Sequence, residues 1–200
     1  MSTETISPKS RLLKEAARIF GDKGFSGASV REICKAADTS SNMIHHYFGS
    51  KQGLYDAVIE RFSQDVFDVP IRVISNVPDS VEAFSTRLQI FFEESLEALV
   101  VNRRIYELAN RERLIVPSFA EYNASLIAFM ESGKSNGFVR PELDCEMVTG
   151  LFLDRLGPQI FYAEQIKQLQ GENLLEPGEY RKRWMKANLD LFLHGIVKSG

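Results

Sequence analysis

The side chains best able to do chemistry gather in one short segment of the sequence. Ser40, Ser41, Asn42, His45 and His46 fall within seven positions and offer hydroxyl, amide and imidazole groups. Asn can form two hydrogen bonds with adenine in the major groove of DNA, and Ser and His can donate to the phosphate backbone. This combination of side chains indicates a surface that binds nucleic acid.

Two short helices joined by a turn must position these groups. The first is expected over 30–37, where Ser29 is a suitable N-terminal cap. Its inward-facing residues are expected to be Val30, Ile33, Cys34 and Ala37. The turn that follows is assigned to Asp38 and Thr39, because Asp is common in tight turns.

The second short helix, expected over 41–48, carries polar side chains on one face. Ile44 and Phe48 are spaced i, i+4 and are the expected core anchors. With these two turned inward, Ser41, Asn42 and His45 lie on the opposite face. Two such helices form a helix-turn-helix, which places its second helix in a DNA groove.

Metal binding and enzymatic chemistry are poorly supported by the same residues. Adjacent His45 and His46 point about 100° apart on a helix, and no third ligand lies near in sequence, so no metal is expected. An enzyme that uses His45, His46 or His194 as a base would need a nucleophile or metal beside it, and no such motif is present. Cys34 and Cys145 are expected to be small buried side chains, with a redox sensor as the less favoured alternative.

Length and composition describe an ordinary globular chain. The 200 residues are 44% hydrophobic and 26% charged, which suits one or two folded units. No segment approaches the roughly eighteen uninterrupted apolar residues of a membrane span. The N-terminus lacks a basic region followed by an apolar stretch, so we expect no secretory signal and no membrane partner, and a cytoplasmic location.

The net charge of −3 hides an uneven distribution along the chain. Residues 1–55 contain eight Lys and Arg against five Asp and Glu, a local charge of +3, so the remainder carries −6. Binding to phosphate needs cations only on the docking face. A locally basic segment on an acidic body is therefore compatible with DNA binding.

The rest of the chain shows helical patterns and no strand signals. The further helices are expected over 8–20, capped by Ser7; from Lys51, capped by Ser50 and fading before Pro70; and over 79–101, 103–114, 117–136, 144–169 and 177–197. The fold class is therefore all-α, with about nine helices. We expect an N-terminal three-helix helix-turn-helix DNA-binding domain over 1–55 and a C-terminal helical bundle over 56–200.

The last two long helices are apolar on more than one face. A helix of this kind must be buried on two sides, either deep in its own domain or against a second copy of the chain. We favour association of two copies over a deeply buried single-chain bundle. The candidate dimer-interface residues are Leu151, Phe152, Leu156, Trp184, Leu189 and Phe192.

Three stretches of the sequence resemble one known family. They are Gly24–Ile33 (GFSGASVREI), Ala36–Phe48 (AADTSSNMIHHYF) and Gly49–Leu54 (GSKQGL). Together with the pattern AAxIF at residues 16–20, they make the chain similar to the TetR-type transcriptional regulators. The resemblance covers about the first sixty residues, and beyond them only the length and the all-helical pattern agree.

The resemblance implies contact with DNA from three successive helices. The residues implied are Ser29, Val30 and Arg31 in the first, Ser40, Ser41, Asn42, Met43, His45, His46 and Tyr47 in the second, and Lys51 in the third. Arg31, Ser41 and Asn42 are the best candidates for base contacts, and Lys51 with its neighbouring amides suits a phosphate. The plainer alternatives are that Ser40 only caps its helix and that Lys51 is an ordinary solvated lysine.

Three residues depart from the pattern of the family. Asp38 stands where Gly is usual in the turn, but Asp tolerates a left-handed backbone better than most residues, so the turn can survive. His45 stands where a Tyr usually contacts the DNA backbone, while Tyr47 stands where His is common. Both side chains can still donate to phosphate.

The resemblance further implies that the C-terminal part dimerises through its last two long helices and encloses a cavity for a small effector. The candidate cavity residues are Phe91, Phe92, Tyr106, Phe119, Tyr122, Phe129 and Arg155. Aromatic residues at helical spacing more often form plain core. Arg155 is more simply explained by pairing with neighbours of Asp154 or with a partner subunit than by an anionic ligand.

These observations lead to one favoured function and two alternatives. We expect a homodimeric repressor that binds a palindromic operator in double-stranded DNA and is released by a small-molecule effector, without a cofactor. The first alternative is a ligand-binding or adaptor protein of the same fold that does not bind DNA. The least favoured is a His-dependent enzyme.

Overall fold

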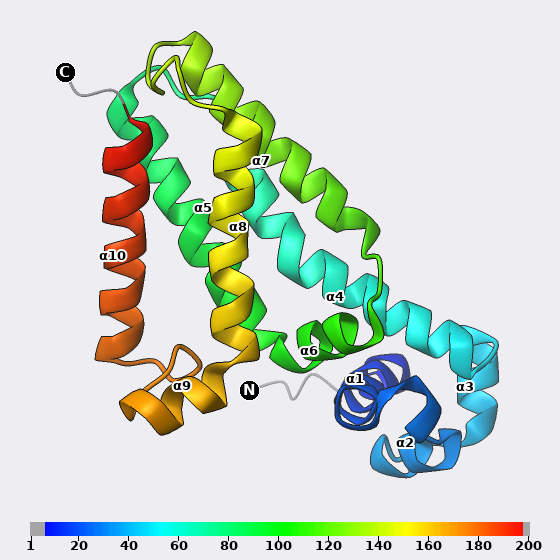
Figure 1. Ribbon diagram of the computed structural model, residues 1–200. Coiled ribbons are helices and arrows are strands. Elements are labelled where there is room, and N and C mark those ends of the chain that lie inside the picture. The colour runs from blue at the N-terminus through cyan, green and yellow to red at the C-terminus, as the bar shows by residue number, and fades with distance from the viewer. Residues whose placement is uncertain (1–6, 198–200) are drawn as a thin grey trace, which may run out of the picture. The chain divides into compact units, whose positions relative to one another are not determined.

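Helices form the whole regular structure of the protein. The computed structural model describes residues 7–197, and over this range the backbone forms ten helices and no strand (Figure 1). One isolated bridge pairs Val139 with Val197 in antiparallel fashion. The predicted all-α fold is confirmed.

The chain divides into two units, which we call the N-terminal unit and the C-terminal unit. The N-terminal unit runs to Gln64 and includes Asn102–Val116, and the C-terminal unit comprises Asp65–Val101 and the chain from Pro117 onward. The N-terminal unit contains α1 (Pro8–Gly27), α2 (Val30–Ala36), α3 (Ser41–Phe48), the first part of α4 (Lys51–Val73) and α6 (Arg103–Glu112). The predicted division into 1–55 and 56–200 is one of function and stays a prediction.

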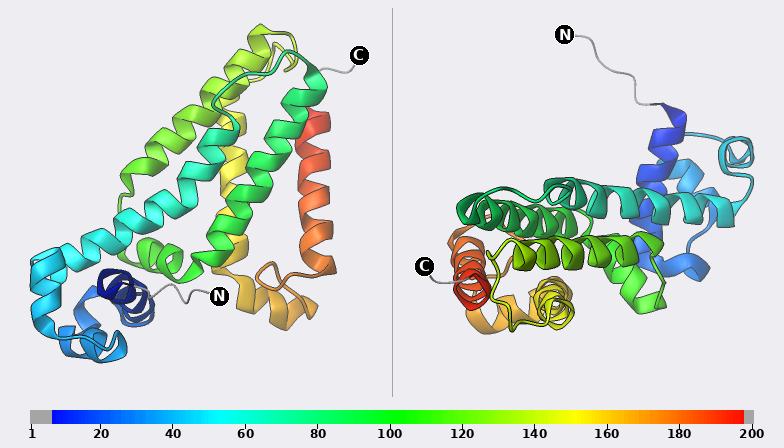
Figure 2. Two further views of the ribbon diagram at one scale, coloured as in Figure 1. Left: turned by 180° about the vertical axis from the view of Figure 1, so that it is seen from behind. Right: turned by 90° about the horizontal axis from the view of Figure 1, so that it is seen from above.

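The C-terminal unit is a helical bundle. It contains the end of α4, α5 (Val81–Val101), α7 (Pro117–Ser135), α8 (Cys145–Phe161), α9 (Ala163–Gln170) and α10 (Glu179–Ile196). Seen from above in Figure 2, α8 and α10 appear nearly end-on, whereas α5 and α7 run obliquely to them. Helix α8 packs against α5 and α7, and α10 packs against α5.

Serine caps start three of the helices as the sequence predicts. The hydroxyl oxygen of Ser7 accepts a hydrogen bond from the amide of Ser10, at 3.2 Å, where α1 begins. The Ser29 hydroxyl accepts from the amide of Glu32 at 3.2 Å, and the Ser50 hydroxyl from the amide of Gly53 at 3.0 Å. These bonds satisfy N–H groups that have no partner within the helix.

Three helix boundaries differ from those predicted. Helix α1 continues beyond the predicted glycine stop to Gly27, with a kink at Gly24, whose φ of 73° is open to glycine at little cost. Helix α4 continues through Pro70 to Val73, because its burial outweighs one missing hydrogen bond. The predicted helix 144–169 divides into α8 and α9 at Tyr162, four residues after Pro158, which makes ten helices instead of about nine.

Candidate nucleic-acid interface

A tight turn connects α2 to α3 and sets the direction in which α3 begins. The amide of Ala37 donates to the carbonyl of Ile33 at 2.9 Å, and the amide of Thr39 donates to the carbonyl of Cys34 at 3.0 Å. Between them Asp38 has a φ of 49°, in the left-handed region. The structure therefore confirms that Asp can take the backbone conformation for which glycine is usual here.

A side chain of helix α1 forms two hydrogen bonds with this turn. The Arg11 guanidinium donates to the carbonyl of Ala37 at 3.1 Å and to the carbonyl of Asp38 at 3.3 Å. Both carbonyls lie beyond the hydrogen-bonding pattern of α2 and would otherwise need another donor. One side chain thus satisfies two acceptors of the turn between α2 and α3.

The two serines that precede α2 and α3 have different roles. Ser29 caps α2 through its hydroxyl, whereas Ser40 occupies the capping position of α3 without forming a side-chain capping bond. The alternative that the Ser40 side chain only caps α3 is therefore wrong. Ser40 is exposed, so its hydroxyl is available to an external acceptor such as a phosphate.

The predicted division of α2 and α3 into buried and exposed faces is largely found. Ile33 and Ile44 are buried, and Phe48 and Val30 are half-buried. On the other face, five of the predicted DNA-contacting residues are exposed: Arg31, Ser41, Asn42, His45 and His46. Met43 is half-buried. Exposed guanidinium, hydroxyl and amide groups on a rigid pair of helices can hydrogen-bond to base edges.

His45 and Tyr47, each of which stands where the other residue type is usual in the family, both have contacts near the C-terminal end of α3. Nδ1 of His45 lies 3.0 Å from the carbonyl oxygen of Gly49, which can only accept, so Nδ1 carries the proton and donates. The His46 ring meets the Tyr47 ring edge-on, with centroids 4.8 Å apart. Because Nδ1 of His45 is already engaged, only Nε2 of that ring is left for a ligand.

Helix α4 begins close against the end of α3. A Cβ atom on Gly53 would lie 2.0 Å from the carbonyl oxygen of Phe48, so only glycine allows this approach. The ammonium of Lys51, which is half-buried, lies 4.4 Å from the centre of the Phe25 ring. This cation–π contact orients Lys51, and its contact with phosphate stays a prediction.

Side chains of helix α6 form hydrogen bonds with α1 and α4 that the sequence patterns did not predict. The carboxylate of Glu112 accepts a hydrogen bond from the amide of Phe25 at 3.0 Å and another from the hydroxyl of Tyr55 at 2.5 Å. Arg111 donates to the carbonyl of Gly21 at 2.9 Å. Burial first, and then the hydrogen bond and charge of Glu112, raise the pKa of Tyr55 well above its usual range, so Tyr55 donates as a neutral hydroxyl.

Five of the six predicted aromatic cavity residues belong to the C-terminal unit, where their rings pack on one another and on neighbouring rings. Phe91 stacks on Tyr122 with centroids 5.1 Å apart, and Phe84 stacks on Phe129 at 4.6 Å. The Tyr122 hydroxyl donates to the hydroxyl of Ser95 at 2.7 Å. Phe92 packs against rings of α8 and α10, and Phe119 against Tyr122 and a ring of α4. The sixth, Tyr106, is a half-buried residue of α6 in the N-terminal unit.

Arg155 lies at the seam between α8 and α10. Its guanidinium donates to the side-chain oxygen of Asn188 at 3.1 Å and lies 5.3 Å from the centre of the Phe192 ring. The amide of Asn188 in turn donates to the carbonyl of Trp184 at 2.8 Å. These contacts tie α8 to α10 within one chain, and the role predicted for Arg155 in effector binding stays a prediction.

The predicted dimer-interface residues fall into two groups. Phe152, Leu156, Leu189 and Phe192 are buried within the C-terminal unit, where they have little surface left for a second copy. Leu151 is 63% exposed and Trp184 is half-buried. One chain already covers most of the apolar side chains named, and contact of the others with a second copy stays a prediction.

The described residues contain no group of three His, Cys, Asp or Glu side chains that could hold a metal ion. Cys34 and Cys145 are both buried and unpaired with each other, as small core side chains are. In the same part of the chain, no helix combines the length and the apolar character that crossing a bilayer requires.

Comparison with known proteins identifies relatives over both units. Residues 12–58 match the family model described as bacterial regulatory proteins, tetR family. The chain is 26% identical over 163 residues to the HTH-type transcriptional regulator UidR of Escherichia coli, which covers 77% of this chain and 80% of UidR. It is also 26% identical over 145 residues to the HTH-type transcriptional repressor KstR2 of Rhodococcus jostii, which covers 70% and 71% of the two chains.

The fold is shared with a solved structure over almost its whole length. The ketosteroid transcriptional regulator KstR2 of Mycobacterium tuberculosis superposes with a TM-score of 0.71 at 22% identity, covering 99% of each chain. The match over residues 12–58 contains α2, the turn and α3, where the exposed polar residues lie. Residues 12–58 of this chain therefore match the helix-turn-helix segment of the tetR family, and the chain is similar to HTH-type transcriptional regulators over most of its length.

Proposed function

We propose that this regulator is a homodimeric repressor that binds a palindromic operator and is released by a small effector. The observation that carries the proposal is the exposed polar surface of α2 and α3, with Arg31, Ser41 and Asn42 beside buried Ile33 and Ile44. A helix-turn-helix dimer binds two half-sites about 34–36 Å apart, one in each successive major groove. The similarity to regulatory proteins favours this function over the enzymatic alternative.

Binding to DNA is tested with the region upstream of the protein's own gene, using fluorescence anisotropy at several salt concentrations. We expect sequence-specific binding that weakens as salt rises, because phosphate contacts release counterions. Ser41→Ala and Asn42→Ala should each weaken specific binding by about 1–3 kcal/mol, the cost typical of a lost base contact. Asn136→Ala, at an exposed turn in the C-terminal unit, is the matched control and should bind normally.

Two outcomes would contradict this part of the proposal. The first is the absence of salt-sensitive binding to any palindrome in that region. The second is regulation in cells that survives the Ser41→Ala and Asn42→Ala changes, since an adaptor without DNA contact would behave in that way.

The second copy is proposed to cover an apolar stripe on α8 and α10. The stripe consists of Met147, Leu151 and Leu191, which are 59%, 63% and 57% exposed, together with half-buried Trp184. Met147 and Leu151 are one turn apart on α8, and Trp184 and Leu191 two turns apart on α10, so each pair lies on one face of its helix. Exposed apolar residues grouped in this way mark protein interfaces.

Dimerisation is tested by light scattering of the full chain after gel filtration. The wild type should show twice the 22.7 kDa mass of one chain. Leu151→Asp and Leu191→Asp should shift the mass toward that of the monomer, because each would bury a charge in the interface. Leu169→Asp on α9, at an 85% exposed leucine outside the stripe, should leave the mass unchanged. A monomeric wild type would refute the dimer.

The effector is proposed to act by favouring a state with a different separation of the two recognition helices. Such coupling typically amounts to about 1–3 kcal/mol, or a 5- to 150-fold change in operator affinity. By linkage, operator DNA must weaken effector binding by the same factor. Measuring both factors tests this step, since unequal values would exclude a simple two-state release.

A further inference from the structure

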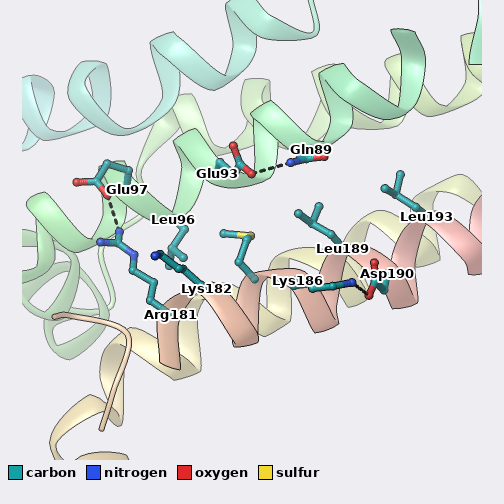
Figure 3. Close-up of a pocket in the computed structure, with 11 residues that line it drawn as sticks. Gln89, Glu93, Leu96, Glu97, Arg181, Lys182, Lys186, Leu189, Asp190 and Leu193 are labelled. Carbon is teal, nitrogen blue, oxygen red and sulfur yellow. Dashed lines mark hydrogen bonds and ion pairs between the residues drawn. The ribbon is translucent and has the colours of Figure 1, made fainter. Parts of the chain in front are cut away.

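A groove runs between α5 and α10 in the C-terminal unit, outside the aromatic core. Its volume is about 430 Å³, within the range of about 300–1,000 Å³ typical of small-molecule sites. Four apolar side chains line it: Leu96 from α5, and Met185, Leu189 and Leu193 from α10. Figure 3 shows Leu96 near the end with Arg181 and Leu193 toward the opposite end. A groove of this size with apolar side chains along its length suits an elongated apolar molecule.

Charged side chains on the rim of the groove are mostly paired with each other. Arg181 of α10 donates to the carboxylate of Glu97 of α5 at 2.6 Å and so bridges the groove at one end. Lys186 is paired with Asp190 along α10 at 2.5 Å. Figure 3 shows these two pairs and, on the α5 side, Glu93 next to Gln89, with which it forms a hydrogen bond. The rim cations Arg181 and Lys186 are thus already matched.

Lys182 and Glu93 are the exceptions. Both line the groove, and among the residues that the structure describes neither has an ion-pair partner. Glu93 accepts only from the neutral amide of Gln89, and the exposed Lys182 is the one cation of the lining that is not matched. Figure 3 shows Lys182 toward the end of the groove where Arg181 meets Glu97, and Leu96 is part of the same lining. An unpaired ammonium beside apolar side chains complements a molecule with an apolar chain and an anionic end. We propose that this groove is the effector site and that the effector is an amphipathic anion anchored by Lys182.

The groove and the apolar stripe lie on opposite faces of α10. With about 100° per residue, Lys182, Met185 and Leu189 share one face, and Trp184 and Leu191 lie on the other. A second copy that covers the stripe therefore leaves the groove open. The inference rests on the proposed function, because an effector requires a regulator that its binding releases.

The aromatic core is the competing site. Phe84, Phe91 and Phe92 are each fully buried, and their rings are in contact with other rings of the same unit. A ligand among them would have to displace well-packed side chains, at a cost in packing energy. The groove needs no such rearrangement, which favours it over the core.

The test uses three probes with the same twelve-carbon chain and different head groups: dodecanoate, dodecan-1-ol and dodecyltrimethylammonium. Binding to the full-length protein is measured by calorimetry below the concentrations at which the probes form micelles. Dodecanoate should bind most tightly. Lys182→Gln should weaken dodecanoate about tenfold, the effect of about 1.4 kcal/mol from one charge-assisted hydrogen bond, and leave dodecan-1-ol unchanged. Lys182→Glu should reverse the preference toward dodecyltrimethylammonium.

Arg183→Gln is the matched control, since it removes an exposed cation from the same turn of α10 outside the groove and should not change dodecanoate binding. Operator affinity is measured in parallel, with and without dodecanoate, for wild type and Lys182→Gln. Weakening of operator binding that requires Lys182 supports the inference. Failure to bind dodecanoate, binding that Lys182→Gln does not affect, or binding without any change in operator affinity would each overturn it. If the protein bound no operator even without a probe, the proposed function itself would fail.

Discussion

Removing the Glu112 carboxylate should loosen the contact of α6 with α1 and α4. Glu112→Ala deletes the acceptor for the Phe25 amide and for the Tyr55 hydroxyl, and Tyr55 is only 5% exposed. A hydrogen bond to a charged group contributes about 1.5–3 kcal/mol, and a buried hydroxyl left without a partner is itself destabilising. Because Glu112 is half-buried, solvent reduces the combined loss to about 2–4 kcal/mol.

The assay is urea unfolding of the full chain, followed by circular dichroism, with a double-mutant cycle. Glu112→Gln and Tyr55→Phe are measured singly and together, and we expect a coupling energy of about 1–2 kcal/mol between them. Glu107→Ala on the same helix is the control. Glu107 is half-buried like Glu112, but it pairs with Arg103 one turn earlier in the same helix at 2.8 Å, and such i, i+4 pairs contribute about 0.3–0.5 kcal/mol.

Two results would refute this reasoning. One is a coupling energy between Glu112 and Tyr55 that cannot be distinguished from zero, which would mean that their short contact adds nothing to stability. The other is a loss in Glu112→Ala no larger than in Glu107→Ala, which would make Glu112 an ordinary surface charge.

Three further predictions concern the helix-turn-helix. Asp38→Val should lower stability in thermal unfolding by about 1–2 kcal/mol, because a β-branched residue is strained at a φ of 49°, whereas Asp38→Gly should not lower it. Gly53→Ala should lower the free energy of unfolding by about 2–4 kcal/mol and weaken DNA binding, because its Cβ would meet the carbonyl of Phe48. As a control, Gly150→Ala, in open space within a helix, should raise the free energy of unfolding by about 0.5–1 kcal/mol. His45→Ala should weaken operator binding, because it removes the Nε2 atom that the bond between Nδ1 and Gly49 leaves for a ligand, and an unchanged affinity would exclude His45 as a DNA contact.

Local signals in the sequence were enough to predict most of the helices and which residues of α2 and α3 are buried or exposed. Caps at Ser7, Ser29 and Ser50 and the spacing of Ile33 and Ile44 depend on neighbours within a turn or two, and each is found in the structure. The turn survived with Asp38 because short polar residues can adopt a left-handed backbone. Patterns of this range fix which face of a short helix is exposed.

The hydrogen bonds that hold α1, α6 and the turn together could not be predicted, because they join residues distant in sequence. Glu112 contacts Phe25, which is 87 positions away, and Arg11 contacts the turn 26 positions later. An isolated Glu or Arg in a helical pattern looks the same whether it faces water or binds a buried donor. Only the packing of α1 against α6 distinguishes the two cases.

Periodicity also could not assign the faces of the last helices. On α8, Leu151 and Phe152 are neighbours in sequence and equally apolar, yet one is exposed and the other buried. On α10, Leu189 lines the groove and Leu191 faces away from it. For a helix that is apolar on two faces, the positions of the neighbouring helices must be known before the contacts of either face can be assigned.

The two hydrogen bonds from Arg11 to the turn also bear on how quickly the protein would bind the proposed operator. A recognition helix whose angle is set by its own scaffold is already ordered before DNA arrives, so association requires no local folding and little loss of conformational entropy. The association rate should then be governed by long-range attraction between the basic first 55 residues and DNA. Sequence discrimination would be expressed mainly in how long each complex lasts.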